Sequence, residues 1–269
     1  MSFIIESADN KKIKNILKLH KASERRDRGV VLVEGYKEIL AALKSGLPLV
    51  EIYYCGEYGG ENPSFFGVPS NQGVLANVPK DIFEKISYRE DPDGYLAIFS
   101  IKKLKLEEVK LSAKPLVLVM EGMEKPGNFG AVLRTADAAG VDVIIVNDPQ
   151  LDIYHPNAIR ASIGSIFDKQ IVKSTRQETI AFLAANNITT YATSKRGEKD
   201  FYDFDLTLGT AFILGAEHSG LSEEWRESAD EYIKIPMTGV VDSLNLSASA
   251  AILLFEAVRQ RKNQLKIKN

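Results

Sequence analysis

Short, continuous apolar runs alternate with segments of helical periodicity between residues 115 and 262. The runs have the length and composition of buried parallel strands. They are LVLVME (116–121), VDVIIV (141–146), ITTYAT (188–193), AFILGA (211–216) and EYIKIP (231–236). FGAVLRTADAAG (129–140) and a last segment of about 246–262 predict helices. This alternation predicts an α/β fold with a mainly parallel sheet, in which ligands bind where strands lead into loops.

A smaller set of alternating helices and strands precedes this region. It includes the segments VVLVEG (30–35), EILAALKSG (38–46) and LVEIYYC (49–55). The pattern is lost over residues 101–114 and stops at Pro115. We therefore predict a first, smaller α/β domain of residues 1–100, a linker of residues 101–114 and a second domain of residues 115–269.

The composition argues against several classes of protein. Cys55 is the single cysteine, which rules out an intrachain disulfide and a multi-cysteine zinc site. The three histidines are scattered, so a histidine-based metal centre is not expected. No apolar run approaches the roughly 18–20 residues that span a bilayer, and the N-terminus lacks the pattern of a secretion signal. We expect a cytoplasmic protein without a metal.

Positive charge is concentrated near the N-terminus, although the formal net charge of the chain is −2. Residues 11–28 hold eight Lys or Arg against Glu24 and Asp27. A helix here would gather its apolar residues on one face and leave the lysines opposite. The predicted apolar face consists of Ile13, Ile16, Leu17 and His20. A basic face can bind RNA phosphates or can simply be solvated. The candidate RNA-binding residues are Lys11, Lys12, Lys14, Lys18, Arg25 and Arg26.

The loop after the first strand of the second domain is rich in glycine. In EGMEKPGNFG (121–130), Gly127 and Gly130 allow a tight turn, and Asn128 stands where a helix N-cap is expected. Arg134 follows in the second turn of that helix. These residues can form a ligand site, or they can be an ordinary capped helix with a surface arginine.

Two later strand ends also carry unusual polar residues. In LGAEHSGLS (214–222), Ser222 begins a helix, whereas the carboxylate of Glu217 has no such role. In the loop of residues 235–249, polar and apolar residues alternate before the last helix. The polar residues are Ser243, Asn245, Ser247 and Ser249. One of them must cap the helix, so we expect others to face a ligand, unless they bond back to the helix backbone.

Common catalytic fingerprints are absent from the sequence. There is no G-x-G-x-x-G followed by an acidic residue, no P-loop and no G-x-S-x-G. A nucleotide-dependent enzyme such as a dehydrogenase would need a phosphate-binding fingerprint of this kind. That class is therefore disfavoured.

Taken together, the loops resemble the motifs of the SpoU/TrmH family of RNA ribose 2′-O-methyltransferases, part of the SPOUT class. The matching segments are EGMEKPGNFGAVLRTADAAG (121–140), HPNAIRASIGSIF (155–167), ILGAEHSGLSEE (213–224) and IPMTGVVDSLNLSASAAILLFEAVRQ (235–260). Residues 10–100 more weakly resemble the ribosomal-protein-like substrate-binding domain of many members. Lys125 departs from the family, which often has Asp there. The resemblance implies a SPOUT catalytic domain with a deep C-terminal trefoil knot, preceded by a smaller RNA-binding domain.

The resemblance also implies roles for individual residues. Asn128 and Arg134 would belong to the catalytic loop and helix, and Glu217 would support the site. Ser243 and Asn245 would lie at its reacting end. S-adenosylmethionine is expected at Thr193, Leu214, Gly215, Ile235, Met237 and Leu244, and RNA also at Arg160. Family members are homodimers whose active sites lie at the subunit boundary.

A protein of this family would transfer the methyl group of S-adenosylmethionine to a ribose 2′-hydroxyl of structured RNA. We favour ribosomal RNA because a separate N-terminal domain is present, which is an argument by family analogy. The alternatives are a tRNA 2′-O-methyltransferase and a catalytically inactive RNA-binding member. A free guanidinium has a pKa above about 12. We therefore expect Arg134 to bind the target phosphate and stabilise the developing alkoxide rather than to act as a base.

Overall fold

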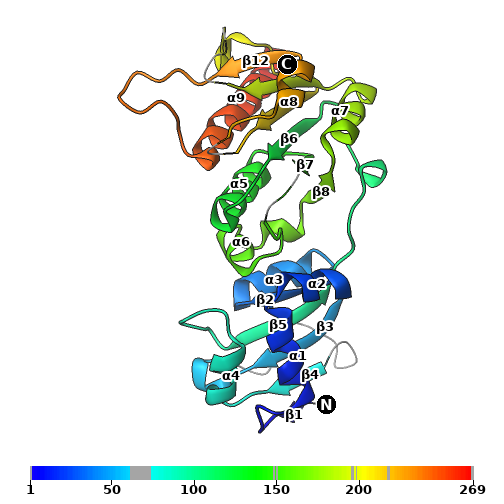
Figure 1. Cartoon of the computed structure of the whole chain (residues 1–269), viewed down its shortest axis with the longest axis vertical. Coiled ribbons are helices and arrows are strands. Elements are labelled where there is room, and N and C mark those ends of the chain that lie inside the picture. The colour runs from blue at the N-terminus through cyan, green and yellow to red at the C-terminus, as the bar shows by residue number, and fades with distance from the viewer. Residues whose placement is uncertain are drawn as a thin grey trace. The chain divides into compact units, whose positions relative to one another are not determined.

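The computed structural model describes residues 2–60, 74–147, 149, 151–194, 197, 199–216 and 219–267. The chain divides into two compact units, each with its own sheet (Figure 1). The first consists of Met1–Lys102 and Tyr154–Asp168, and the second of Lys103–Ile153 and Lys169–Asn269. Residues 154–168 thus group with the first unit, whereas the sequence predicts them within the second domain.

A seven-stranded sheet in the order β10-β12-β9-β11-β6-β7-β8 forms the second unit. Its strands are β6 (Leu116–Glu121), β7 (Val143–Asn147), β8 (Gln170–Ser174), β9 (Thr189–Thr193), β10 (Lys199–Asp200), β11 (Thr210–Leu214) and β12 (Glu231–Lys234). Every neighbouring pair of these described strands runs parallel, which confirms the predicted α/β sheet. All residues of β6, β7 and β11 are buried, as continuous apolar runs require. The sequence did not predict β8 and β10, which contain polar residues.

The helices of this unit are α5 (Pro126–Ala138), α7 (Arg176–Ala185), α8 (Glu223–Ser228) and α9 (Leu246–Ile267). Helix α5 packs against α9 (Figure 1), which brings the first and third motifs together. The prediction of Asn128 as the N-cap of α5 is wrong, because Lys125 occupies that position. Pro126 follows at the first helical position, where its fixed φ and missing N–H are tolerated. Asn128 is the third residue of the helix.

The predicted linker is an ordered part of the second unit. Its apolar residues pack against the core of that unit, and they are Leu104, Leu106, Val109 and Leu111. Leu104 forms a bridge with Val172 of β8. The amide of Lys110 donates to Oε1 of Gln170 at 2.9 Å. Apolar residues of the predicted linker therefore pack against the second unit beside β8.

The first unit contains a mixed five-stranded sheet in the order β1-β4-β3-β5-β2. Its strands are β1 (Ser2–Ile4), β2 (Val30–Glu34), β3 (Leu49–Tyr54), β4 (Val74–Asn77) and β5 (Tyr95–Ser100). Its helices are α1 (Lys11–Leu19), α2 (Ala22–Arg28), α3 (Tyr36–Lys44), α4 (Lys80–Ile86) and α6 (Pro156–Ala161). Short 3₁₀ helices are η1 (Gly56–Tyr58) and η4 (Ser165–Phe167) here, and η3 (Leu106–Glu108) and η5 (Phe201–Asp203) in the second unit. The smaller mixed α/β domain is thereby confirmed.

Two further observations concern the described part of the chain. None of its helices is both long and apolar enough to span a bilayer. Among the same residues, no group of three or more His, Cys, Asp or Glu side chains could hold a metal ion. Cys55 is buried in the core of the first unit.

Candidate active site

The carboxyl ends of β12, β9 and β11 lie next to one another in the sheet. Thr193 ends β9 and pairs with Ile233 of β12, and its hydroxyl donates to the carbonyl of Ile213 at 3.0 Å. Leu214 ends β11 and is buried, while Ile235 directly follows β12. The structure thus gathers at one sheet edge Thr193, Leu214, Gly215 and Ile235, which the family resemblance assigns to the cofactor.

After β11 the chain folds back on itself in a closed turn. The amide of Ala216 donates to the carbonyl of Gly220 at 3.2 Å, and the amide of Gly220 donates back at 3.0 Å. A Cβ atom on Gly215 would lie 2.3 Å from the carbonyl carbon of Gly220 and 2.5 Å from the amide nitrogen of Leu221. Gly220 has a φ of 68°, which glycine adopts without steric cost. Glu217, the predicted supporting carboxylate, lies outside the described residues.

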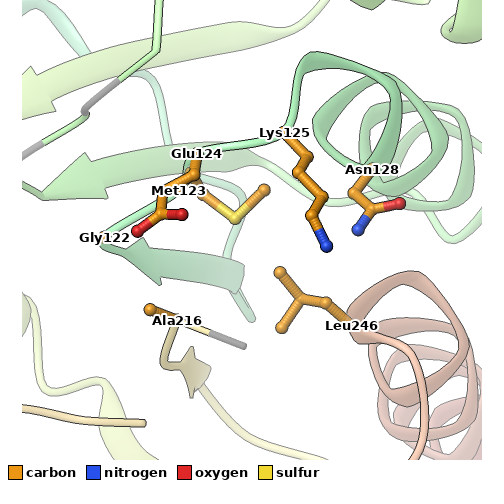
Figure 2. A pocket seen from close by; sticks show the side chains of 7 residues that line it. All are labelled: Gly122, Met123, Glu124, Lys125, Asn128, Ala216 and Leu246. Atoms are coloured by element: carbon orange, nitrogen blue, oxygen red, sulfur yellow. The ribbon is translucent and has the colours of Figure 1, made fainter. Parts of the chain in front are cut away.

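A pocket forms where the loop after β6 meets this turn and the start of α9 (Figure 2). Its lining residues are Gly122, Met123, Glu124, Lys125, Asn128, Ala216 and Leu246. Lys125 and Asn128 extend toward Leu246, whereas Glu124 points to the other side (Figure 2). Three motifs that are far apart in the sequence therefore contribute to one pocket. It combines apolar side chains with polar groups from the first turn of α5.

Arg134 lies apart from this pocket. It is exposed on α5, six residues after Asn128, which places it about 9 Å further along the helix axis. Within the described residues, its guanidinium forms no hydrogen bond or ion pair. A single chain therefore does not bring Asn128 and Arg134 into the same pocket, although both were predicted for one catalytic loop and helix.

The third loop leaves the sheet after β12 and returns at α9 as an extended excursion (Figure 1). Ile235 and Met237 are half-buried, and residues 238–245 are exposed. Among the exposed side chains are the apolar ones of Val240, Val241 and Leu244. The hydroxyl of Ser243 donates to Oδ1 of Asp242 at 3.1 Å. Of the expected residues of this loop, Ser243 and Leu244 thus lie on the surface of the chain, whereas Ile235 and Met237 are partly covered.

Asn245 stands directly before α9. Its Oδ1 accepts the amide of Ser247 at 2.9 Å and the hydroxyl of Ser247 at 2.6 Å. This is the bonding of a helix N-cap. Among the polar residues of the loop, Asn245 therefore provides the cap that the last helix needs.

Two buried polar side chains at strand ends were missed by sequence reasoning. Glu121 ends β6, is 4% exposed, and accepts the amide of Ser222 at 2.8 Å and the guanidinium of Arg176. Asn147 ends β7, is fully buried, and accepts the indole N–H of Trp225 at 3.3 Å. Both join strand ends to α8. The available signal was a polar residue closing a buried apolar run, since a buried polar group requires partners.

The apolar face of α1 differs from the predicted one. Ile13, Ile16 and Leu19 are buried, whereas Leu17 is 41% exposed. The prediction that Leu17 belongs to the packed apolar face is therefore wrong. Leu19, the last residue of the helix, lies on that face together with Ile13 and Ile16. His20 follows as the C-cap, and its ring contacts the carbonyl of Ile86 at 2.9 Å.

Several cations of the predicted basic face are engaged within the first unit. Lys12 pairs with Glu51, and Lys14 pairs with Asp9 at 2.8 Å. Arg25 is 4% exposed and donates to the carbonyls that end α1, with 2.9 Å to that of His20. Its burial removes it from the candidate RNA surface, which corrects that assignment. Arg26 is exposed and pairs with Asp27 at 3.8 Å. The other exposed candidates are Lys11, Lys14, Lys18 and, on α6, Arg160, and Lys21 is exposed as well.

Comparison with known proteins extends over both units. Residues 115–255 match the SpoU rRNA Methylase family, and residues 10–97 match the MRM3-like substrate binding domain. The chain is 30% identical over 248 residues to the 23S rRNA (uridine(2479)-2′-O)-methyltransferase of Streptomyces viridochromogenes, covering 89% of this chain and 86% of that protein. It is 29% identical over 254 residues to the 23S rRNA (guanosine(2553)-2′-O)-methyltransferase RlmP of Bacillus subtilis (strain 168), covering 93% and 97%.

A solved structure also carries the cofactor. It is that of the SpoU methyltransferase AviRb from Streptomyces viridochromogenes in complex with AdoMet, which is S-adenosylmethionine. It matches with a TM-score of 0.86 at 28% identity, over 94% of this chain and 98% of that chain. The expected cofactor and enzyme class are thereby confirmed. The chain belongs to the SpoU rRNA methylase family of S-adenosylmethionine-dependent ribose 2′-O-methyltransferases.

Proposed function

We propose that this chain methylates a ribose 2′-hydroxyl of 23S rRNA. The observation that carries the proposal is the convergence of the three family motifs at one pocket beside the carboxyl ends of the parallel strands. Both relatives named above act on 23S rRNA and align with the first unit as well as the second. The rRNA target is therefore favoured over tRNA. As an enzyme of ribosomal RNA, the protein works in the cytoplasm.

The cofactor site lies at the turn of residues 215–220 and the strand ends beside it. Gly215 approaches Gly220 and Leu221 closely, and the amide and carbonyl groups of Ala216 and Gly220 pair with each other, so backbone groups lie beside the strand ends. This suits recognition of the cofactor by N–H and C=O groups. Bound there, S-adenosylmethionine supplies an activated sulfonium methyl group. The residues assigned to it are Thr193, Leu214, Gly215 and Ile235 from the strand ends, with Met237 and Leu244 from the third loop.

The remaining task of the protein is to align the ribose and to manage one proton. Alignment of the attacking oxygen contributes roughly 7–11 kcal/mol at best. We assign Asn128, in the pocket, to positioning of the ribose. The guanidinium of Arg134 binds the target phosphate and stabilises the developing alkoxide, since a guanidinium is a cationic hydrogen-bond donor and a poor base. The proton of the 2′-hydroxyl then leaves through a neighbouring oxygen. Glu217, Ser243 and Asn245 complete the assigned set.

Two chains form the working enzyme. Arg134 lies outside the pocket of its own chain, and the third loop exposes Val240 and Val241 to water. Burying a valine side chain contributes about 1.5–3 kcal/mol, so a second chain that covers the loop would stabilise the assembly. We therefore propose a homodimer with shared active sites. The trefoil knot implied by the family belongs to the same proposal and involves residues 235–260.

RNA capture is assigned to residues 1–100 and methyl transfer to residues 115–269. The exposed cations of the first unit supply phosphate contacts that position the RNA without reading its sequence. Among them are Lys11, Lys18, Lys21 and Arg160. Lys12, Lys14 and Arg26 contribute less because each is already paired with a carboxylate.

Mapping of 2′-O-methyl groups tests the target. RNA is compared from cells with and without this protein, and purified protein is incubated with S-adenosylmethionine and unmodified 23S rRNA or tRNA. We expect a 23S rRNA ribose to lose its methyl group in cells and to regain it in vitro. A change confined to tRNA would assign the enzyme to tRNA. Cofactor binding and methylation both absent would favour the inactive RNA-binding alternative.

A further inference from the structure

Glu121 is a buried carboxylate for which the reaction has no direct use. It is 4% exposed at the end of β6, and a charge removed from water requires partners. Its two carboxylate oxygens accept hydrogen bonds from different partners. Oε2 accepts the backbone amide of Ser222 at 2.8 Å, and Oε1 accepts Nε–H of Arg176. One carboxylate therefore joins the end of a central strand to the residue that begins α8.

Arg176 extends this connection. It is the first residue of α7, and its Nη1 donates to Oε2 of Glu224 at 3.0 Å. Its guanidinium thus bridges the carboxylate of β6 and a carboxylate in the first turn of α8. Ser222 caps the same turn by accepting the amide of Trp225 at 3.5 Å. The start of α8 is consequently tied to both β6 and α7.

The cofactor turn ends where these contacts begin. Gly220 closes the turn two residues before Ser222. The intervening Leu221 is buried, and its amide nitrogen would lie 2.5 Å from a Cβ on Gly215. Because the backbone is packed this closely, a displacement of Ser222 moves the wall of the turn against Gly215.

We propose that Glu121 and Arg176 are positioning residues that fix Ser222 and thereby the shape of the turn that holds S-adenosylmethionine. The inference rests on the cofactor site proposed above. Neither residue touches the cofactor in this proposal. Their role is to keep the backbone groups of Gly215, Ala216 and Gly220 in the geometry that binds it.

A second contact holds α8 in place independently of Arg176, so a change at Arg176 can alter the cofactor turn without unfolding the helix. The indole of Trp225 is buried in the core and donates to Asn147 at 3.3 Å. Helix α8 therefore stays docked through Trp225 when Arg176 is changed. The expected displacement is confined to the first turn of α8 and to the cofactor turn before it.

The test compares Arg176→Gln, Arg176→Lys and Glu224→Gln with the control Arg226→Gln. Arg226 pairs with Glu223 at 3.3 Å on α8, where the two side chains are 53% and 71% exposed. The control thus removes an ion pair from the same helix without affecting its connection to β6. S-adenosylmethionine affinity is measured by calorimetry on the full chain, together with thermal unfolding and RNA affinity at fixed salt.

We expect Arg176→Gln to weaken S-adenosylmethionine binding by on the order of tenfold to a hundredfold. Arg176→Lys should recover only part of the loss, because an ammonium lacks the planar fork that bridges two carboxylates. Glu224→Gln should give a smaller loss. RNA affinity in all variants, and cofactor affinity in Arg226→Gln, should equal those of the wild type.

Folded Arg176→Gln and Arg176→Lys proteins with wild-type cofactor affinity would overturn the proposal. An equal loss in Arg226→Gln would overturn it as well, since any change on α8 would then suffice. If Arg176→Gln does not fold, Arg176→Lys and Glu224→Gln decide, because neither leaves Glu121 without a cation. A wild-type chain that itself binds no S-adenosylmethionine would instead overturn the proposed cofactor site.

Discussion

The second and third loops both carry family motifs, but the chain supports them in different ways. The turn of residues 215–220 is closed by its own backbone hydrogen bonds, and Glu121 holds Ser222 beside it. Residues 238–245 are exposed, with Val240 and Val241 in water. One chain therefore preforms the part of the cofactor site that lies at the strand ends. The third loop, which carries the remaining cofactor residues and Ser243, still lacks a cover, which a second chain or the substrate must provide.

The largest effect is expected at Arg134, which is exposed on α5 and, like the third loop, is not covered by its own chain. Arg134→Ala should lower single-turnover methylation by about a hundredfold or more, the scale of losing one group that stabilises the transition state. The free energy of unfolding should change by less than about 0.5 kcal/mol, because the side chain is exposed and forms no hydrogen bond or ion pair with the residues that the structure describes. Methylation assays and urea unfolding measure the two. Near-normal methylation would make Arg134 an ordinary surface arginine.

Mixing experiments sharpen this prediction. If each site takes Arg134 from one chain and the cofactor turn from the other, Arg134→Ala mixed with Gly215→Ala should regain activity. A mixed dimer would then hold one intact site. No recovery on mixing would place both residues in a site formed by one chain.

A matched pair of glycine substitutions contrasts the two loops directly. Gly215→Ala places a Cβ 2.3 Å from the backbone of Gly220, whereas a Cβ on Gly239 meets no atom within 4 Å. Gly215→Ala should therefore cost about 1–3 kcal/mol of stability, as overpacking does, and weaken S-adenosylmethionine binding. Gly239→Ala should change neither. Thermal unfolding measures the stability of the two variants, and calorimetry measures their affinity for S-adenosylmethionine. Similar results for both variants would contradict the proposed difference between a preformed second loop and an uncovered third loop.

The smallest expected effect concerns Asn245, which caps α9 at the end of the uncovered loop. Asn245→Ala should lower the free energy of unfolding by about 1 kcal/mol because the bonds to Ser247 are lost. Asn245→Asp should retain the cap and the stability. Methylation is then measured for Asn245→Asp, and a loss in this stable variant separates a role in the reaction from the role as a cap. Unchanged methylation would leave Asn245 with the cap alone.

Much of the fold follows from local patterns. β6, β7 and β11 were predicted because strands buried on both faces must be apolar along their whole length. The order of the motifs sufficed to predict the family. The exact start of α5 was missed. The sequence offers Asn128 as a plausible N-cap, but in the structure Lys125 is the N-cap and the helix begins at Pro126. The role of Arg25 was also missed, since its charge is visible in the sequence and its burial against the end of α1 is not.

The partners of the polar residues depend on how the strands are ordered. Glu121 meets Arg176 at a separation of 55 residues and Ser222 at a separation of 101. The contact with Ser222 exists because β11 lies beside β6 in the sheet, although β7, β8, β9 and β10 come between them in the chain. The contact with Arg176 exists because α7 begins after β8, which only β7 separates from β6 in the sheet. Periodicity reports whether one residue is buried, and motif spacing reports which chemistry a loop can carry. A hydrogen bond joins two groups, and here their proximity is set by long-range strand pairing that no local pattern encodes.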